Sequence, residues 1–203
     1  ESEAAMQLAM HLAQAYEREA EGDLLARAWK RIMTPAAKFW VCKRSVELTG
    51  EAMEIFGGNG YVQDSIVSRL FREAPVNSIW EGSGNVMCLD VLRAMAREPD
   101  AARLLLQNLI DMATGEPSLM ALAQSLAQRL SAAPESLEPQ ARRLVQDLSL
   151  LAQACLLRKH ALSYMAEGFI HTRLAEQRGA LVVGAFDPAM LDMAAILERC
   201  LPS

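Results

Sequence analysis

The sequence has few aromatic residues and few β-branched ones, and this shortage bears first on the fold. Phenylalanine, tryptophan and tyrosine together make up 5% of the 203 residues, whereas 52% are hydrophobic and 22% are charged. Alanine, leucine, methionine, glutamate, glutamine and arginine dominate instead, and these residues favour helix over strand. A globular chain of this length can bury a sizeable core. We therefore predict an all-α fold.

The sequence also lacks paired cysteines. Its four cysteines stand far apart and none belongs to a CxxC pair: Cys42, Cys88, Cys155 and Cys200. This spacing argues against a disulfide framework and against a zinc site, and it is typical of a protein of the reducing cytoplasm. The three histidines are scattered without metal-ligand spacing. We predict no metal site.

Long hydrophobic runs and an excess of basic residues are missing as well. No apolar run reaches the roughly 18–20 residues that span a bilayer, and no signal peptide is recognisable, so we predict no membrane association. The chain starts at Glu1 and has a helical pattern at once, which predicts a piece of a longer protein. The formal net charge is −5, and residues 98–203 carry nine basic and twelve acidic side chains. This balance argues against strong non-specific binding to nucleic acid.

Hydrophobic spacing and helix-boundary residues predict a series of helices. The predicted ranges are 1–20, 24–31, 34–56, 69–73, 82–98, 100–113, 118–132, 139–178 and 187–200. Residues 59–68 are predicted as a loop, and residues 180–183 as a connector. Pro99 ends the first unit, so we divide the chain into a helical bundle part at 1–98 and an appended helical part at 99–203.

Particular residues set several of these boundaries. Thr34 before Pro35 predicts an N-cap followed by a proline in the first helical turn. Gly57 is expected to end the helix that starts there, and Gly50 within it suggests close packing against another helix. The long helix at 139–178 is expected to break near Gly168.

The run Phe56–Tyr61, FGGNGY, is the first of two motifs that stand out. Its glycines allow a backbone with positive φ and close approach to a ligand. A dinucleotide-binding fingerprint would follow a strand and open a helix, but this run follows a helix, which argues against a Rossmann loop. A helix C-cap and turn without any ligand is the remaining alternative.

The second motif surrounds Glu81, a carboxylate between Trp80 and Gly82. A carboxylate in apolar surroundings is poised for proton transfer. The small and polar residues at 82–85 leave backbone N–H groups unpaired at a helix start, where an anion or phosphate can bind. The alternative is that Glu81 only provides a negative charge near the N-terminus of the following helix.

Together these motifs resemble the C-terminal signature of the acyl-CoA dehydrogenases. The resemblance rests on the runs Glu54–Tyr61 (EIFGGNGY), Leu70–Ala74 (LFREA) and Ile79–Ser83 (IWEGS). The family has a GGxGY turn, an arginine–acid pair on a short helix, and an aromatic-Glu-Gly-Thr segment before its last helix. The ordered match covers about residues 34–97, and three linked motifs are far more specific than one glycine run.

The resemblance implies a role for Glu81 and its neighbours. Glu81 stands where the family has the base that removes the α-proton of an acyl-CoA thioester while a hydride leaves for FAD. Gly82 would lie along the thioester, and Trp80 would belong to the same substrate-binding segment. Some family members have their base on another helix, so the resemblance also leaves a poorly active protein open.

The resemblance also implies a cofactor site. Ser83 and Asn85 replace the threonine and glutamine that contact FAD in the family. Gly57 and Gly58 would approach the FAD of a neighbouring subunit, because the family builds each site across a dimer interface. Glu54 stands where the family usually has a cofactor-facing glutamine. FAD and an acyl-CoA would bind to the intact protein, a homodimer or homotetramer, and FAD would bind weakly or not at all to these 203 residues alone.

The run from Pro75 to Arg93 resembles one branch of the family more closely, the AidB-like flavoproteins of the alkylation response. That branch carries a helical extension, which residues 99–203 would provide, and a DNA affinity attributed to that extension. The alternative function is therefore a DNA-associated protein with weak or no dehydrogenase activity, although the charge of residues 98–203 does not support it. A purely structural oligomerisation module is a third interpretation. Cys88 departs from the pattern, since many members have arginine there.

Overall fold

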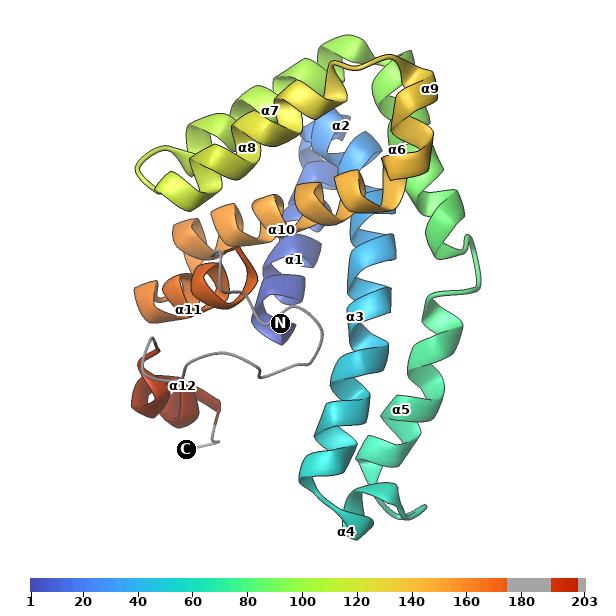
Figure 1. Cartoon of the computed structure of the whole chain (residues 1–203), viewed down its shortest axis with the longest axis vertical. Helices are drawn as coiled ribbons and strands as arrows, with labels where there is room; N and C mark the ends of the chain where they lie inside the picture. Colours follow the sequence, from blue (N-terminus) through green and yellow to red (C-terminus); the bar gives the residue numbers. More distant parts are fainter. Residues whose placement is uncertain (175–190, 201–203) are drawn as a thin grey trace.

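The described part of the chain is helical throughout, which confirms the predicted all-α fold. The structure is a computed structural model that describes residues 1–174 and 191–200 (Figure 1). In these ranges it contains helices and no strand. The α-helices are α1 (Ser2–Ala20), α2 (Leu24–Ala28), α3 (Thr34–Ile55), α4 (Gly58–Tyr61), α5 (Ile66–Asn77), α6 (Gly84–Arg97), α7 (Pro99–Ala113), α8 (Pro117–Leu130), α9 (Pro134–Leu137), α10 (Ala141–His160), α11 (Ser163–Arg173) and α12 (Met193–Cys200). A π-helical turn, η1 (Trp29–Met33), and a 3₁₀ turn, η2 (Glu138–Gln140), complete the series.

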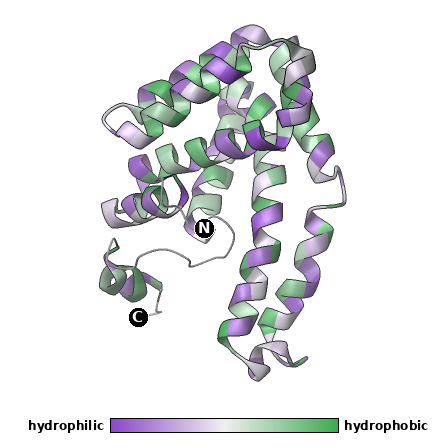
Figure 2. Cartoon of the chain, in the orientation of Figure 1, coloured by the Kyte–Doolittle hydropathy of each residue, from purple (hydrophilic) through white to green (hydrophobic). Residues whose placement is uncertain are grey.

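Helix α10 is the centre of the fold. Every residue from Asp147 to Leu157 is buried, as expected for a helix that is covered on all sides. It packs against α1, α3, α6, α8 and α11. Most of the surrounding helices have one apolar and one polar face, as the colouring in Figure 2 shows.

The core is continuous across the predicted boundary near residue 98. Leu8, Trp29 and Leu151 belong to the same cluster of buried side chains. The indole Nε1 of Trp40 on α3 donates a hydrogen bond of 2.9 Å to the Gln153 side chain on α10, and both residues are buried. The division into 1–98 and 99–203 stays a prediction about family organisation, because packing joins the two parts.

Helices α3 and α5 form a hairpin that projects beyond this core, with α4 at its tip (Figure 1). The expected close packing at Gly50 is found here. A side chain at Gly50 would start 3.3 Å from the Phe71 ring of α5, so the glycine lets the two helices approach.

The predicted cap at Thr34 is wrong. Helix α2, capped by Asp23, continues through η1 directly into α3, and Thr34 has helical backbone angles. A proline ring clashes with the carbonyl four residues earlier in a regular α-helix. The wider π-helical turn before Pro35 relieves this conflict, so the chain keeps one continuous helical path.

Three other boundaries differ from the prediction. Helix α5 starts at Ile66, after the Ser65 cap, and keeps Pro75 in its last turn, so it is longer than the predicted turn at 69–73. The predicted loop at 59–68 overlaps both α4 and the first residues of α5. The helix at 139–178 breaks at residues 161–162 and not near Gly168, which lies inside α11.

The remaining predictions concern the end of the chain. Helix α12 confirms a helix within 187–200, whereas its predicted start at Asp187 and the connector at 180–183 lie outside the described residues. The short helix α9 had no counterpart in the prediction, whereas η2 overlaps the start of the helix predicted at 139–178. None of the described helices has both the length and the apolar character that a bilayer span requires.

Candidate functional site

Glu81 lies in the connection between α5 and α6, and its backbone is unusual. Its φ is 54°, and among the described non-glycine residues no other has a positive φ. Gly82 follows with a φ of 120°. Backbone conformations of this kind are strained in L-residues and concentrate at functional sites.

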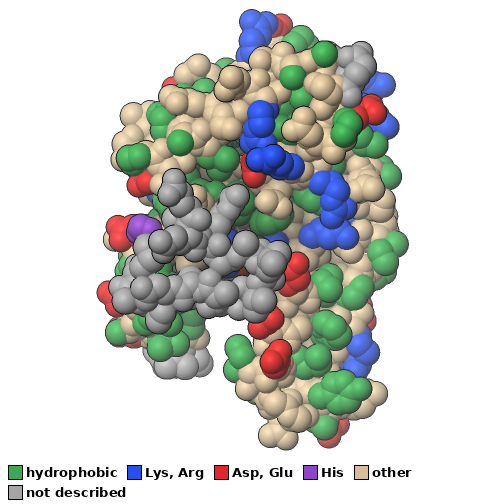
Figure 3. Space-filling model, viewed as in Figure 1, with side chains coloured by type: hydrophobic (Ala, Val, Ile, Leu, Met, Phe, Trp, Pro, Cys, Tyr) green, Lys and Arg blue, Asp and Glu red, His purple; other side chains and the backbone are tan. Residues whose placement is uncertain are grey.

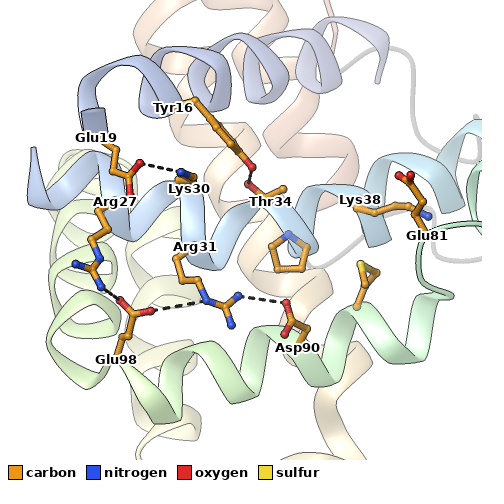
Figure 4. Close-up of a pocket in the computed structure, with 12 residues that line it drawn as sticks. Tyr16, Glu19, Arg27, Lys30, Arg31, Thr34, Lys38, Glu81, Asp90 and Glu98 are labelled. Carbon is orange, nitrogen blue, oxygen red and sulfur yellow. Dashed lines mark hydrogen bonds and ion pairs between the residues drawn. The ribbon is translucent and has the colours of Figure 1, made fainter. Parts of the chain in front are cut away.

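A lysine from α3 holds this connection. The Lys38 Nζ donates hydrogen bonds to the backbone carbonyls of Asn77, Trp80 and Gly82, at 2.7, 2.7 and 3.1 Å. Figure 4 shows Lys38 beside Glu81 at one end of the cavity. No local motif in the sequence marks Lys38 as a site residue, because its partners lie about forty positions away.

Glu81 borders a cavity of about 560 Å³ between α1, α3 and α6. Ion pairs line its other end (Figure 4), with Arg31 Nη1 3.2 Å from Asp90, Arg27 Nη2 3.0 Å from Glu98 and Lys30 Nζ 2.7 Å from Glu19. These pairs are partly exposed, so each adds little stability. Their main effect is to give this wall of the cavity both signs of charge.

The expected apolar environment of Glu81 is not present in this chain. Glu81 is exposed, and Trp80 beside it is 55% exposed. The two side chains therefore do not form a desolvated pair within these 203 residues. Any desolvation of the carboxylate has to come from a bound ligand or from other protein segments.

Helix α6 begins directly after this connection and has the features of an anion site. Ser83 is its N-cap, and no side chain caps the first N–H groups. Gly84 is buried, and a side chain there would start 3.3 Å from the Phe39 ring, which fixes the start of the helix close to α3. Free N–H groups at a helix start suit a phosphate or another anion.

Asn85 in the first turn of α6 is linked to the appended helices. Its side-chain oxygen accepts a hydrogen bond of 2.9 Å from Arg142 Nη1 of α10. The Arg142 guanidinium also lies 5.4 Å from the centre of the Phe39 ring. Arg142 is a second residue that sequence analysis missed, again because the contact is distant in sequence.

Cys88, one turn further along α6, belongs to the core and not to the site. It is completely buried, and burial raises the pKa of its thiol to about 11, although the Arg142 charge lowers it somewhat. All four cysteines are free. In residues 1–174 and 191–200, no group of three His, Cys, Asp or Glu is placed to bind a metal ion.

The glycine motif lies at the tip of the α3–α5 hairpin. Gly57 has a φ of 57°, and neither Gly57 nor Gly58 has an atom within 4 Å of the space that a side chain would occupy. Glu54 is exposed nearby. Gly60 is different, because a side chain there would start 2.2 Å from the Met53 carbonyl.

The structure does not bring the two motifs together within one chain. Lys38 marks the Glu81 end of α3, and Gly57 follows its other end nineteen residues later. At 1.5 Å per residue this is about 28 Å. One small ligand cannot contact both the Glu81 connection and the glycine turn of the same chain.

Known proteins with similar sequences belong to one family. The family model described as acyl-CoA dehydrogenase, C-terminal domain, matches residues 1–96. AidB of Escherichia coli, an acyl-CoA dehydrogenase by name, is 38% identical over 172 residues, which are 85% of this chain and 31% of AidB. Acyl-CoA dehydrogenase family member 11 of Caenorhabditis elegans is 44% identical over 66 residues, which are 32% of this chain and 11% of the relative. The chain spans about a third of the length of AidB and less of the second relative.

Solved structures agree with the fold. The apo form of Bd2924 has a TM-score of 0.70 and 30% identity over 79% of this chain and 31% of that one. Caenorhabditis elegans ACDH-11, in complex with C11-CoA, has a TM-score of 0.73 and 22% identity over 97% of this chain and 37% of that one. At that identity the second match supports the fold alone. With the matched domain at residues 1–96, this chain belongs to the acyl-CoA dehydrogenase family.

Proposed function

We propose that this chain is the C-terminal part of an FAD-dependent enzyme that oxidises an acyl-CoA thioester between its α and β carbons. The observation that carries the proposal is Glu81, an exposed carboxylate on a strained backbone in the connection before α6, at the border of a cavity. The family membership supports the reaction class. This activity is proposed for a longer protein that contains these residues, because the chain spans only about a third of the length of AidB.

Glu81 is the proposed base. Its carboxylate accepts the α-proton of the thioester, and this C–H acid is weak, so the carboxylate has to lose solvent when the substrate binds. Trp80 and Gly82 flank Glu81 and are proposed to contact the thioester. Trp80 is exposed and can cover a ligand as an apolar wall without leaving a packed core.

The start of α6 is proposed to hold part of FAD. Its uncapped N–H groups, the Ser83 hydroxyl and the Asn85 amide are donors that fit a phosphate-bearing group, which supports the assignment. Since Arg142 occupies the Asn85 oxygen, the Asn85 amide N–H groups remain to donate. FAD, when bound, would accept the β-hydrogen as hydride.

Gly57, Gly58 and Glu54 are proposed to face the FAD of a second copy of the chain. The separation of about 28 Å along α3 supports a partner's site rather than their own. The hairpin tip is also rich in exposed apolar side chains, with Ile55 83%, Phe56 61% and Tyr61 75% exposed. Hydrophobic side chains are visible on this projecting part in Figure 3. Such a surface favours association, and we propose a homodimer or homotetramer.

The appended part, residues 99–203, is proposed to be the helical extension of an AidB-like protein. The match to AidB covers 172 residues and so continues beyond the family domain at 1–96, which supports this assignment. The four free thiols fit a reducing compartment, and we propose the cytoplasm.

The test is flavin reduction by a panel of acyl-CoAs in the full-length protein that contains this chain. Glu81→Gln keeps the size of the side chain and removes the base. We expect reduction to slow by at least about a hundredfold, within the range contributed by general base catalysis. Equal rates for both proteins would refute Glu81 as the base.

Sedimentation of the same two proteins is the control. Glu81→Gln is expected to leave the oligomeric state unchanged, since Glu81 does not lie at the hairpin tip. Wild-type protein that assembles but reduces no flavin with any acyl-CoA would favour the structural oligomerisation module instead.

A further inference from the structure

Lys38 uses its whole hydrogen-bonding capacity on the backbone around Glu81. An ammonium group has three N–H donors and no acceptor. The carbonyls of Asn77, Trp80 and Gly82 accept all three at ordinary distances of 2.7–3.1 Å. Among the described residues Lys38 forms no ion pair, although Glu81 borders the same cavity.

The positions of these carbonyls matter more than their number. The Trp80 carbonyl belongs to the peptide immediately before Glu81, and the Gly82 carbonyl to the second peptide after it. Both point at one cation. The orientation of these peptides therefore depends on the positive φ values of Glu81 and Gly82, at 54° and 120°. A rotation of either peptide breaks a bond to Lys38.

Little else in the described structure holds this connection in place. Ile79, Trp80, Glu81 and Ser83 are exposed, so packing restrains them weakly. The other backbone hydrogen bonds of residues 78–83 join neighbours in sequence, such as Trp80 N to the Val76 carbonyl and Met87 N to the Ser83 carbonyl. Within the described part of the chain, Lys38 is the tertiary hydrogen-bonding partner of this backbone.

We propose that Lys38 is a positioning residue for Glu81. It holds the peptide immediately before Glu81 and the second peptide after it, and so sets the direction of the carboxylate, while it takes no part in the proton transfer. The inference rests on the proposed role of Glu81 as the base. Its physical basis is that a misplacement of about 1 Å at a reacting group lowers a rate by up to about a hundredfold.

A simpler role for Lys38 is to stabilise the end of α5. Asn77 is the last residue of that helix, and a cation near a helix C-terminus is favourable. That role needs only the Asn77 contact. The bonds to Trp80 and Gly82 lie beyond the helix, and they distinguish positioning of the connection from capping of α5.

The variant that tests the proposal is Lys38→Met, which keeps an apolar stem of similar length and removes the donors. Lys38→Arg keeps a cation with donors, and Lys43→Met is the matched control. Lys43 also lies on α3 near Gly84, but it forms no hydrogen bond to this backbone in the described structure. If Lys38→Met does not fold, Lys38→Gln, with two donors, replaces it.

The first measurement is amide hydrogen exchange in the 203-residue chain. Only residues 78–80 of this connection have backbone N–H groups with a hydrogen bond in the described structure, so they carry the readout. Lys38→Met is expected to speed exchange at these three amides at least about tenfold and to leave the amides of α10 unchanged. Lys38→Arg is expected to recover most of the protection, and Lys43→Met to behave like wild type. Unchanged exchange at residues 78–80 in Lys38→Met would overturn the proposal, and so would loss of protection in α5 alone.

The second measurement is the rate of flavin reduction at saturating acyl-CoA in the full-length protein. Lys38→Met is expected to lower this rate by about tenfold to a hundredfold with substrate affinity within about threefold of wild type. If Glu81→Gln is inactive, and Lys38→Met exchanges faster in this connection but reduces flavin at the wild-type rate, the positioning role of Lys38 is refuted. If Glu81→Gln itself keeps the wild-type rate, the proposed function fails first, and the exchange data still show whether Lys38 holds the connection.

Discussion

At the scale of single residues, the backbone at Glu81 and Gly82 sets the site apart from the rest of the chain. A non-glycine residue at positive φ costs about 1–3 kcal/mol and persists only where the surroundings hold it. Here the surroundings are the ammonium of Lys38 and the packed start of α6. Backbone strain of this kind is typical of sites where the side chain has to point in one fixed direction.

The glycine next to Glu81 gives a prediction at this scale. A side chain at Gly82 would require an L-residue at a φ of 120° and would start 2.3 Å from the end of the Met87 side chain. Met87 can move, but the backbone strain cannot be relieved so easily. We expect Gly82→Ala to lower the free energy of unfolding by about 1–3 kcal/mol.

Gly58→Ala is the matched control, because a side chain at Gly58 meets open space and the residue lies in α4. It is expected to change the free energy of unfolding by no more than about 0.5 kcal/mol. Urea denaturation of both variants provides the comparison. Equal losses would mean that the backbone at Gly82 is not strained.

At the scale of elements, two features join helices that are distant in the sequence. Helices α2 and α3 form one continuous path through the π-helical turn, and this path places Lys38 opposite the end of α5. Helix α10, in the appended part at 99–203, packs against α3. Its buried Gln153 accepts the hydrogen bond from the Trp40 indole.

The hydrogen bond between Trp40 and Gln153 is expected to stabilise the packing of α3 against α10. Gln153→Leu keeps the core apolar and leaves the buried Trp40 N–H without a partner. An unsatisfied buried donor costs about 1–3 kcal/mol, so we expect a loss of that size in the free energy of unfolding. Chemical denaturation measures it.

Trp40→Phe provides the control background, because phenylalanine has no N–H to satisfy. Gln153→Leu is expected to cost clearly less in that background than in wild type, as a double-mutant cycle would reveal. The same loss in both backgrounds would show that the hydrogen bond contributes nothing.

At the scale of the whole molecule, one core spans both predicted parts, and the charge is distributed without a basic excess. Ala4 of α1 and Ile170 of α11 belong to the same cluster of buried side chains. Figure 3 shows the Lys and Arg side chains of one face in several separate groups, with Asp and Glu elsewhere on it. The net charge of −5 repels a polyanion at long range.

The charge of the whole chain bears on whether it binds DNA. We expect the 203-residue protein to bind duplex DNA more weakly than the roughly 10⁻⁴–10⁻⁶ M typical of non-specific binding, even at about 50 mM salt. Fluorescence anisotropy with a labelled duplex at increasing salt measures this. Micromolar binding that weakens steeply with salt would contradict the prediction and favour the DNA-associated alternative.

The sequence by itself determined the helical class, most of the long helices and the family. Helix-forming composition and apolar spacing act locally, so they can be recognised without the fold. The motifs around Gly57 and Glu81 are short and contiguous, and they predicted the family to which the chain belongs. The boundaries predicted at Thr34–Pro35 and near Gly168 failed, whereas those predicted at Gly57 and Pro99 agree with the ends of α3 and α6.

Tertiary structure decided how those helices continue and what surrounds Glu81. Packing kept Pro75 inside α5 and carried the chain through Pro35, because buried contacts outweigh one missing hydrogen bond. Lys38 and Arg142 became part of the candidate site only through contacts across 39–57 positions of sequence. Such contacts depend on how whole helices pack, which no local pattern encodes. The distance between the glycine turn and the Glu81 connection along α3 is likewise set by how the helices pack.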